Sequence, residues 1–467
     1  MSRLIDFSQQ AAASPGLSAG DADSCNIAGR LERIPTSAWH VRARLIVGAA
    51  TFFDAFDMLA IASALPVLIK LWHLSSTEIG ALIATGFMGQ IVGAVIFGWL
   101  ADRIGRVRAL QYSILIFSVM AVACAFSWSY SSLLTFRVIQ GIGIGGEVPI
   151  AASYINELTK AHKRGKFVLL YEMVFSIGVL VAGFIGAWLV PSFGWQSIFL
   201  VGVAPALVAL YMRRSLPESP RWLASKGRFA EADKVVSEIE AFTLNAGLPL
   251  PPARQIATIA TPKARAVELL GPTYLRRTLS VWALWFSVYF VTYGTITWLP
   301  TIYVSIFKFD LRTALILSAF NSMVSFPANF VLAFIIDKIG RRRWFVIGLT
   351  LGALPLIAIW FCGTENHTLV IVLAALSYMF VGPSCSACYL YTPELYPTRL
   401  RAVGSSIATV WLRIASSIGP IAVGVILVHF DYRSVFLMFG LISLCGATAI
   451  GLFGEETSER VLEELSP

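Results

Sequence analysis

Six ionisable residues stand inside long stretches of otherwise apolar sequence: Asp54, Asp57, Arg137, Glu147, Glu172 and Arg413. A charged side chain in an apolar medium is costly unless it is paired, so such residues indicate a ligand site, a proton site or a buried ion pair. Carboxylates take up and release protons, whereas arginine stays charged and needs an anion, carbonyl groups or water. These residue types therefore favour proton transfer together with the binding of an organic anion.

Asp57 and Arg137 are expected at the same depth in a membrane. A rise of about 1.5 Å per residue places Asp57 roughly 18 Å and Arg137 roughly 21 Å from the same surface. A salt bridge between them can be purely structural, or protonation of the aspartate can free the arginine and act as a switch. We expect this pair to form, with Asp54 as a second proton site one helical turn away. Glu147 and Glu172 fall nearer to the inner surface.

Arg413 lies about 16 Å into its apolar stretch and has no acidic residue in that stretch. It could hold a substrate carboxylate, or it could bond to backbone carbonyl groups. Tyr289 and Tyr293, four positions apart, share one helical face, and Trp285 and Trp298 flank them. Such a stripe can be ordinary packing, but at this depth it could also line a cavity and stack on a flat ligand. We predict that these five residues bind the substrate.

The elements that must position these residues are membrane helices. Apolar residues make up 57% of the 467 residues and charged residues 13%, and the mean hydropathy is +0.73, which excludes a soluble globular protein. Apolar runs long enough to cross a hydrocarbon core of about 30 Å predict six spans, a polar stretch and six more spans. The predicted spans are 45–70, 79–100, 109–128, 131–158, 167–190, 195–212, 278–306, 312–336, 344–362, 368–393, 402–428 and 434–454.

The Lys and Arg residues gather on one side of these spans, which predicts that this side is cytoplasmic and that both chain ends lie there. The net charge of +9 is explained in this way and does not indicate nucleic acid. We expect a short interfacial helix near Trp39 in an otherwise mobile tail. The expected regions are a cytoplasmic tail over 1–44, a six-helix bundle over 45–212, a cytoplasmic linker over 213–277, a second six-helix bundle over 278–454 and a cytoplasmic tail over 455–467.

Three other patterns are better explained by apolar helices than by chemistry. Cys385 and Cys388 have redox spacing without a redox context, and the glycines over 141–146 match a dinucleotide motif that no strand precedes. The five histidines are scattered and show no metal-ligand spacing. With no pairing of nucleophile and base either, we expect neither a cofactor nor a metal, and no enzyme.

Two charged motifs occur twice at nearly the same offset. The motif G-x-x-x-D-R-x-G-R over 98–106 returns as A-x-x-x-D-K-x-G-R over 333–341. Arg164 follows Glu157 by seven positions, and Arg401 follows Glu394 by the same number. Two homologous halves are typical of transporters built from internal repeats.

These paired motifs resemble those of the major facilitator superfamily, and the similarity extends over 45–454. The segment 217–223 resembles the sugar-porter ending after the sixth span, and 391–401 resembles the branch of organic anion and cation transporters and synaptic-vesicle-like proteins. Three further segments resemble bacterial niacin transporters: 53–57, 145–151 and 164–172. Aromatic-acid:proton symporters have a similar aspartate pair in the first span.

The resemblance implies a fold of two pseudo-symmetric six-helix bundles and charge pairs that close the inner surface. In the organic-ion branch, arginine at the position matching Arg413 is typical of anion carriers. We therefore expect a monomeric, proton-coupled importer of a small aromatic monocarboxylate in the inner membrane. The alternatives are a carrier of sugars or other neutral solutes, or a sensor on the same fold. The gating residues implied are Asp102, Arg103, Arg106, Glu157 and Arg164 in the first half, with Asp337, Arg341, Glu394 and Arg401 in the second.

Overall fold

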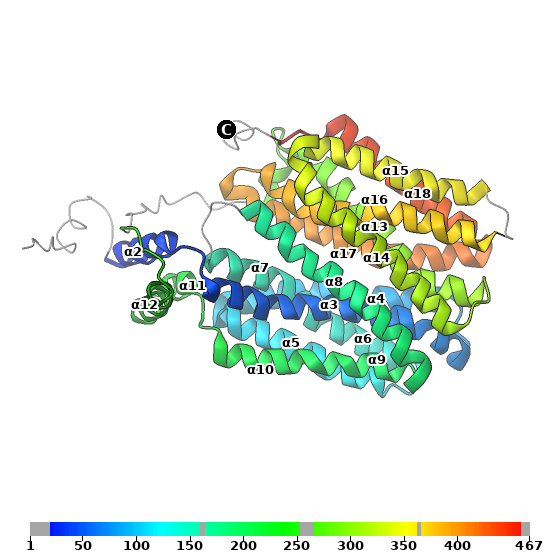
Figure 1. The fold of residues 1–467 in the computed structure, drawn as a ribbon, viewed down its shortest axis with the longest axis horizontal. Coiled ribbons are helices and arrows are strands. Elements are labelled where there is room, and N and C mark those ends of the chain that lie inside the picture. Colours follow the sequence, from blue (N-terminus) through cyan, green and yellow to red (C-terminus); the bar gives the residue numbers. More distant parts are fainter. Residues whose placement is uncertain (1–18, 159–163, 253–265, 362–365, 459–467) are drawn as a thin grey trace, which may run out of the picture.

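In the computed structural model, residues 19–158, 164–252, 266–361 and 366–458 are described, and the regular elements among them are all helical (Figure 1). Twelve helical segments in these ranges are long and apolar enough to cross a membrane. The chain is therefore a multi-pass, all-α membrane protein with two bundles of six spans, as the apolar runs predict. Most helices extend several residues beyond the predicted spans, because the apolar runs are flanked by polar residues that continue the helix into the interface.

The first bundle holds six spans, two of which are interrupted by proline. Pro149 has no N–H to bond the carbonyl group of Gly145, and the chain changes there from one helix to the next. Pro205 likewise has no N–H to bond the carbonyl group of Val201, and a short 3-10 turn over Val201–Val203 separates two helices there. The helices are α3 (Ala38–Trp72), α4 (Ser76–Ile104), α5 (Arg106–Ala125), α6 (Tyr130–Gly145) with α7 (Glu147–Leu158), α8 (Arg164–Phe193), and α9 (Gln196–Leu200) with α10 (Ala204–Ser215).

The second bundle repeats this arrangement, and its first span, like that of the first bundle, is among the most completely buried. Four pairs of helices join the bundles: α3 with α13, α4 with α17, α8 with α14 and, less extensively, α8 with α16. Side chains on α3 and α13 therefore face the centre of the molecule rather than lipid. The helices of this bundle are α13 (Leu275–Ser305), α14 (Leu311–Ile339), α15 (Arg341–Phe361), α16 (His367–Glu394), α17 (Thr398–His429) and α18 (Tyr432–Phe453).

At one end of the bundles, which we call the linker end, three short helices lie together beyond the spans (Figure 1). They are α2 (Ala19–Arg33), α11 (Pro220–Ser225) and α12 (Phe229–Asn245). The expectation of a mobile tail is wrong for residues 19–33, which form a helix docked on the linker. Ile27 and Leu31 of α2 pack into the same apolar cluster as Trp222 and Val236. No isolated interfacial helix forms near Trp39, because α3 already begins at Ala38.

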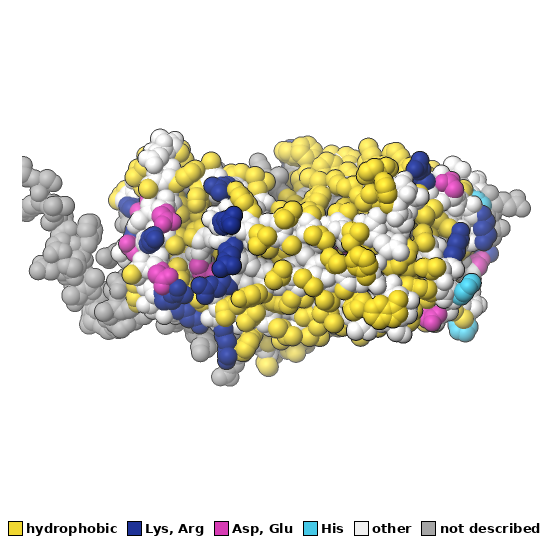
Figure 2. Space-filling model, turned by 90° about the horizontal axis from the view of Figure 1, so that it is seen from below, with side chains coloured by type: hydrophobic (Ala, Val, Ile, Leu, Met, Phe, Trp, Pro, Cys, Tyr) yellow, Lys and Arg dark blue, Asp and Glu magenta, His cyan; other side chains and the backbone are white. Residues whose placement is uncertain are grey.

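Ion pairs fasten α2 to the linker. Arg30 binds Asp233 and lies 2.8 Å from Glu240, and Arg33 also lies 2.8 Å from Glu240. Burial alone would raise the pKa of Glu240, but the hydrogen bonds from Arg30 and Arg33 and their charges bring that pKa below its ordinary value. Figure 2 shows a column of Lys and Arg between these helices and the apolar body. Such a column is typical of a membrane interface.

The opposite end of the molecule is closed by a close approach of α4 and α17. A Cβ atom added at Gly80 of α4 would lie 2.6 Å from the carbonyl oxygen of Pro420. One added at Gly424 of α17 would collide with the carbonyl oxygen of Ser76. Backbones can come this near only where side chains are absent. We call these contacts the glycine seal.

Candidate functional site

A buried ion pair joins α3 to α6 in the middle of the first bundle. Arg137 Nη1 donates to Asp57 Oδ2 at 2.7 Å, and both side chains are 5% exposed. Gln140 Nε2 donates to Asp57 Oδ1 at 2.7 Å, while its Oε1 accepts from Arg137 Nη1 at 2.9 Å. Gln140 follows Arg137 by three residues and therefore shares its helical face. Both carboxylate oxygens of Asp57 are thus occupied by hydrogen-bond donors.

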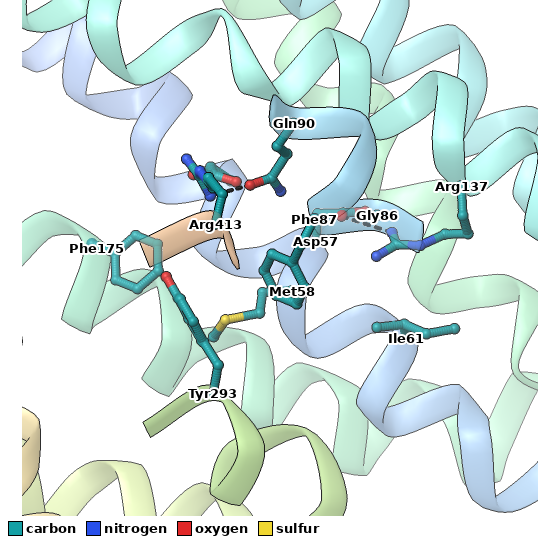
Figure 3. Close-up of a pocket in the computed structure, with 11 residues that line it drawn as sticks. Asp57, Met58, Ile61, Gly86, Phe87, Gln90, Arg137, Phe175, Tyr293 and Arg413 are labelled. Carbon is teal, nitrogen blue, oxygen red and sulfur yellow. Dashed lines mark hydrogen bonds and ion pairs between the residues drawn. The ribbon is translucent and has the colours of Figure 1, made fainter. Parts of the chain in front are cut away.

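Arg413 lies on another side of the same small pocket (Figure 3). It comes from α17 of the second bundle, and its Nη1 binds Oε1 of Gln90 on α4 of the first bundle. Asp54 lines this pocket too, and the charge of Arg413 acts on the Asp54 carboxylate. Arg413 therefore belongs to one bundle by sequence and is held by polar groups of the other.

Asp54 and Arg413 also border the central cavity, a space of about 70 Å³ between the bundles. A cavity needs roughly 10–15 Å³ for each water, so this one has room for a few waters or a small solute. Aromatic side chains form much of its wall. Tyr293 lies 5.5 Å from Tyr289 and 5.3 Å from Phe87, measured between ring centroids. The aromatic residues lining the cavity are Phe175, Tyr289, Tyr293, Tyr378 and Tyr389.

A second part of the cavity wall is polar and uncharged. It comes from α13, α14 and α16 of the second bundle, and its residues are Thr292, Ser322, Ser325, Asn329 and Ser386. Asn329 Nδ2 donates to the Ser325 carbonyl oxygen at 3.3 Å, which leaves its amide oxygen to accept from a ligand. Hydroxyl and amide groups of this kind can orient a bound solute.

Two predicted substrate residues do not line the cavity. Trp285 stacks on Tyr289 with ring centroids 5.4 Å apart, and its Nε1 donates to Thr392 Oγ1 at 2.8 Å. It therefore supports the cavity wall from behind. Trp298 is 1% exposed and lies on a different face of α13 from Tyr293. Five residues along a helix turn a side chain by roughly 140°.

Glu147 lies on the other side of Asp54 from the central cavity. Its Oε1 accepts a hydrogen bond from Thr51 Oγ1 at 2.7 Å. Glu147 and Asp54 border a small pocket enclosed by α3, α5, α6, α7 and α10. The sequence places both residues in the membrane, and the structure brings them to one pocket. The predicted proton residue Glu172 has a side chain outside the described part of the chain.

The duplicated motif of the first half forms a cluster at the linker end. Arg106 lies 2.6 Å from Asp102 and 3.1 Å from Glu157. Glu218 of the linker accepts the backbone N–H of Arg106 at 2.8 Å and so caps the start of α5. Arg103 instead lies over the ring of Trp99 at 4.1 Å. The side chain of Arg164, also predicted to take part, is outside the described part of the chain.

The second half repeats this cluster almost contact for contact. Arg341 lies 2.7 Å from Asp337 and 3.1 Å from Glu394. Glu456 accepts the backbone N–H of Arg341 at 2.7 Å and caps α15. Arg401, also predicted to take part, does not bind this cluster through its Nε. That buried atom has no hydrogen-bond partner in the described structure. We call the two groups, each an Arg, an Asp and two Glu residues, the gate clusters.

Four residues of these sites escape the sequence argument. Gln140 could be found as the polar neighbour of Arg137 on one face, and Gln90 as a lone amide in an apolar helix. Glu218 and Glu456 give no comparable signal, because each caps a helix more than a hundred residues away in sequence. Among the described residues there is no cluster of three or more His, Cys, Asp or Glu side chains that could hold a metal ion.

Comparison with known proteins agrees with this architecture. A family model described as "Sugar (and other) transporter" matches residues 32–467. The chain belongs to this family of the major facilitator superfamily. The partially occluded, inward-open xylose transporter XylE of E. coli superposes with a TM-score of 0.71 at 18% identity, over 91% of this chain and all of that one. The predicted fold of two pseudo-symmetric bundles is confirmed.

Relatives within the family include a niacin transporter and a gallate transporter. The niacin transporter NiaP of Acinetobacter baylyi is 32% identical, over 94% of this chain and 99% of its own length. The gallate transporter of Pseudomonas putida is 28% identical, over 90% and 93% respectively. The predicted resemblance to niacin transporters is thus confirmed at the level of sequence.

Proposed function

We propose that this transporter imports a small aromatic monocarboxylate, nicotinate-like or benzoate-like, together with a proton. The observation that carries the proposal is the placing of Arg413 and the tyrosines around one central cavity. A guanidinium can meet a planar carboxylate with two parallel, charge-assisted hydrogen bonds. Tyrosine rings offer surfaces on which a flat ring stacks. The niacin and gallate carriers among its relatives support the same substrate class.

The remaining parts fit transport by alternating access. The linker end carries the column of Lys and Arg and is taken as cytoplasmic, so both chain ends lie inside the cell. We take the protein to work as a monomer in the inner membrane. The gate clusters lie at that end, and the glycine seal closes the other. In this arrangement the substrate enters past the seal and leaves past the gate clusters, while a buried carboxylate of the first bundle exchanges the proton.

The test compares an acid with its own amide. Nicotinate and nicotinamide are titrated into purified wild type, Arg413→Lys and Arg413→Ala in detergent at one pH. Lysine keeps the charge but loses the two-pronged geometry, so it should weaken the acid measurably. Alanine should cost the acid about 2–4 kcal/mol, because the ligand charge would be buried without a partner. The amide should lose much less in both variants. Equal losses for acid and amide would mean that Arg413 maintains the fold rather than the ligand.

A second candidate is a carrier of neutral solutes. The hydroxyl and amide wall formed by Ser322, Ser325, Asn329 and Ser386 favours it, because such groups bind sugars or an amide equally well. The same titration separates the two functions. Under this candidate the amide or a sugar binds more tightly than the acid in wild type, and Arg413→Ala leaves that preference unchanged.

A further inference from the structure

We propose that Asp54 carries the transported proton. In this scheme the Asp54 carboxylate and the substrate carboxylate alternate as the counter-charge of Arg413. In the empty carrier, the negative charge that balances Arg413 is that of Asp54. In the loaded carrier it is that of the substrate, and Asp54 is then protonated. This inference rests on the proposed function and says how binding of the acid and uptake of the proton are joined.

Asp57 is poorly suited to this role, although its pairing is what the sequence predicts. Its two oxygens accept hydrogen bonds from Arg137 and Gln140, both at 2.7 Å. Protonating Asp57 would leave Arg137, which is also 5% exposed, without a counter-charge in the bundle interior. No cavity-lining cation is released to a substrate by that step, because Arg137 borders the small pocket but not the central cavity.

Asp54 borders the central cavity and the two small pockets beside it. The charged and titratable groups that border the same three spaces come from six helices: Asp57 on its own helix α3, Arg137 on α6, Glu147 on α7, Tyr289 and Tyr293 on α13, Tyr378, Cys385 and Tyr389 on α16, and Arg413 on α17. Among these, Arg413 is the group that also borders the central cavity as a cation. The substrate carboxylate and the Asp54 carboxylate can therefore approach the same guanidinium.

Charge balance then explains coupling. The empty site holds Asp54 as an anion and Arg413 as a cation, and their sum is zero. A substrate anion plus one proton on Asp54 also gives a sum of zero. The substrate alone would leave one uncompensated negative charge at mid-membrane, and the proton alone would leave one positive charge. Both half-loaded forms bury an unpaired charge, so closure around the cavity favours the empty and the fully loaded carrier.

The experiment measures protons taken up when ligand binds. Nicotinate is titrated calorimetrically into wild type, Asp54→Asn and the matched control Asp57→Asn, in buffers of different ionisation enthalpy. Wild type should take up close to one proton with nicotinate and none with nicotinamide. Its affinity for nicotinate should fall by up to about tenfold per pH unit as Asp54 loses its proton. Asp54→Asn should take up no proton, and its affinity should change less than about twofold from pH 6 to pH 8. Asp57→Asn should retain the uptake.

Several results would overturn the inference. Proton uptake retained by Asp54→Asn and lost by Asp57→Asn would assign the proton to Asp57. Equal proton uptake with nicotinate and nicotinamide in wild type would show that the substrate carboxylate does not displace Asp54, and this holds even if a variant fails to fold. Failure of wild type to bind nicotinate would instead overturn the proposed function, and this inference with it.

Discussion

The two bundles are alike at the linker end and unlike at mid-membrane. Each gate cluster consists of an arginine at the start of the third span of its half, an aspartate four residues before it and two glutamates. At mid-membrane the first bundle has Asp54, Asp57 and Arg137, with Glu147 nearer to the inner surface. The second bundle, in its described spans, has the cation Arg413 among tyrosines, hydroxyl groups and an amide. Under the proposed function, duplicated contacts are retained where the halves move and are absent where they bind substrate and proton.

The difference suggests a division of work. Opening and closing involve both bundles equally, so both need the same surface contacts. In the proposed mechanism a substrate and a proton are each bound once, so one bundle can specialise in ring surfaces and the other in carboxylates. Arg413 and Gln90 form the contact where the two specialised regions meet. The four predictions that follow test this comparison.

The largest effect is expected at mid-membrane, where the first bundle has a charge pair and the described spans of the second bundle have none. Asp57→Ala leaves Arg137 buried without a counter-charge and should destabilise the protein by about 3–5 kcal/mol. Asp57→Asn keeps an acceptor for Arg137 and should cost clearly less. Thermal unfolding in detergent, followed by tryptophan fluorescence, measures both. If the two variants unfolded at the same temperature, the pair would contribute no structure, and the bundles would differ less than described.

The gate clusters test the similarity of the halves. Arg106→Ala and Arg341→Ala each remove two ion pairs that join the loop to neighbouring helices. Each should slow transport by on the order of tenfold, about 1.4 kcal/mol in the balance between conformations. Binding should stay within a few-fold, because neither residue borders the cavity. The measurement is uptake into proteoliposomes beside binding in detergent. A large effect in one half alone would break the symmetry.

The tyrosines test whether the second bundle recognises the ring rather than the charge. Tyr289→Ala should weaken binding by about 0.5–1.5 kcal/mol, because stacking surface is lost. Nicotinate and nicotinamide should lose the same amount, in contrast to their response at Arg413. Tyr289→Phe keeps the ring and serves as the control, with little loss expected. Competition binding against a labelled acid measures the affinities of both ligands for wild type and the two variants. A loss of affinity for nicotinate alone would mean that Tyr289 recognises the charge of the ligand.

The smallest effect is expected in the linker, which docks on the first bundle. The pKa of Glu240 lies below its ordinary value of 4.5, so its ion pairs stabilise the docked α2 fully above about pH 4.5. This contribution disappears as the pH falls through the lowered pKa, and it amounts to less than about 1 kcal/mol at a partly screened site. Hydrogen exchange of α2, corrected for intrinsic rates, should rise at low pH. In Glu240→Gln, the hydrogen exchange of α2 should be equal at low pH and above about pH 4.5.

Much of the fold and part of the site could be predicted from sequence, for a physical reason. Helical rise is fixed, so the depth of a residue can be counted along its span, and Asp57 and Arg137 were matched in this way. The direction in which a side chain points around the helix axis can also be counted from the sequence. Counting it for Trp298 would have turned that side chain away from Tyr293 by roughly 140°.

What could not be predicted depends on how the bundles face each other. Asp54 and Arg413 line one pocket because α4 packs against both α3 and α17, and no local pattern fixes the rotation of one bundle against the other. The docked helix α2 was missed because it has few apolar residues, with Ile27 and Leu31 the main ones. Its stability comes from partners that lie two hundred residues further along the chain.

The glycine seal has a consequence for how this carrier responds to salt. It joins backbone to backbone at Gly80 and Gly424 and includes no charged group. The gate clusters at the other end are ion pairs whose aspartates, Asp102 and Asp337, are largely open to water. Dissolved ions screen charges over about 8–10 Å at moderate ionic strength but leave contacts between carbonyl groups and glycines unchanged. Raising the ionic strength should therefore weaken the contacts at the linker end and leave the glycine seal unchanged. Salt should then shift the carrier toward the conformation that is open at the linker end.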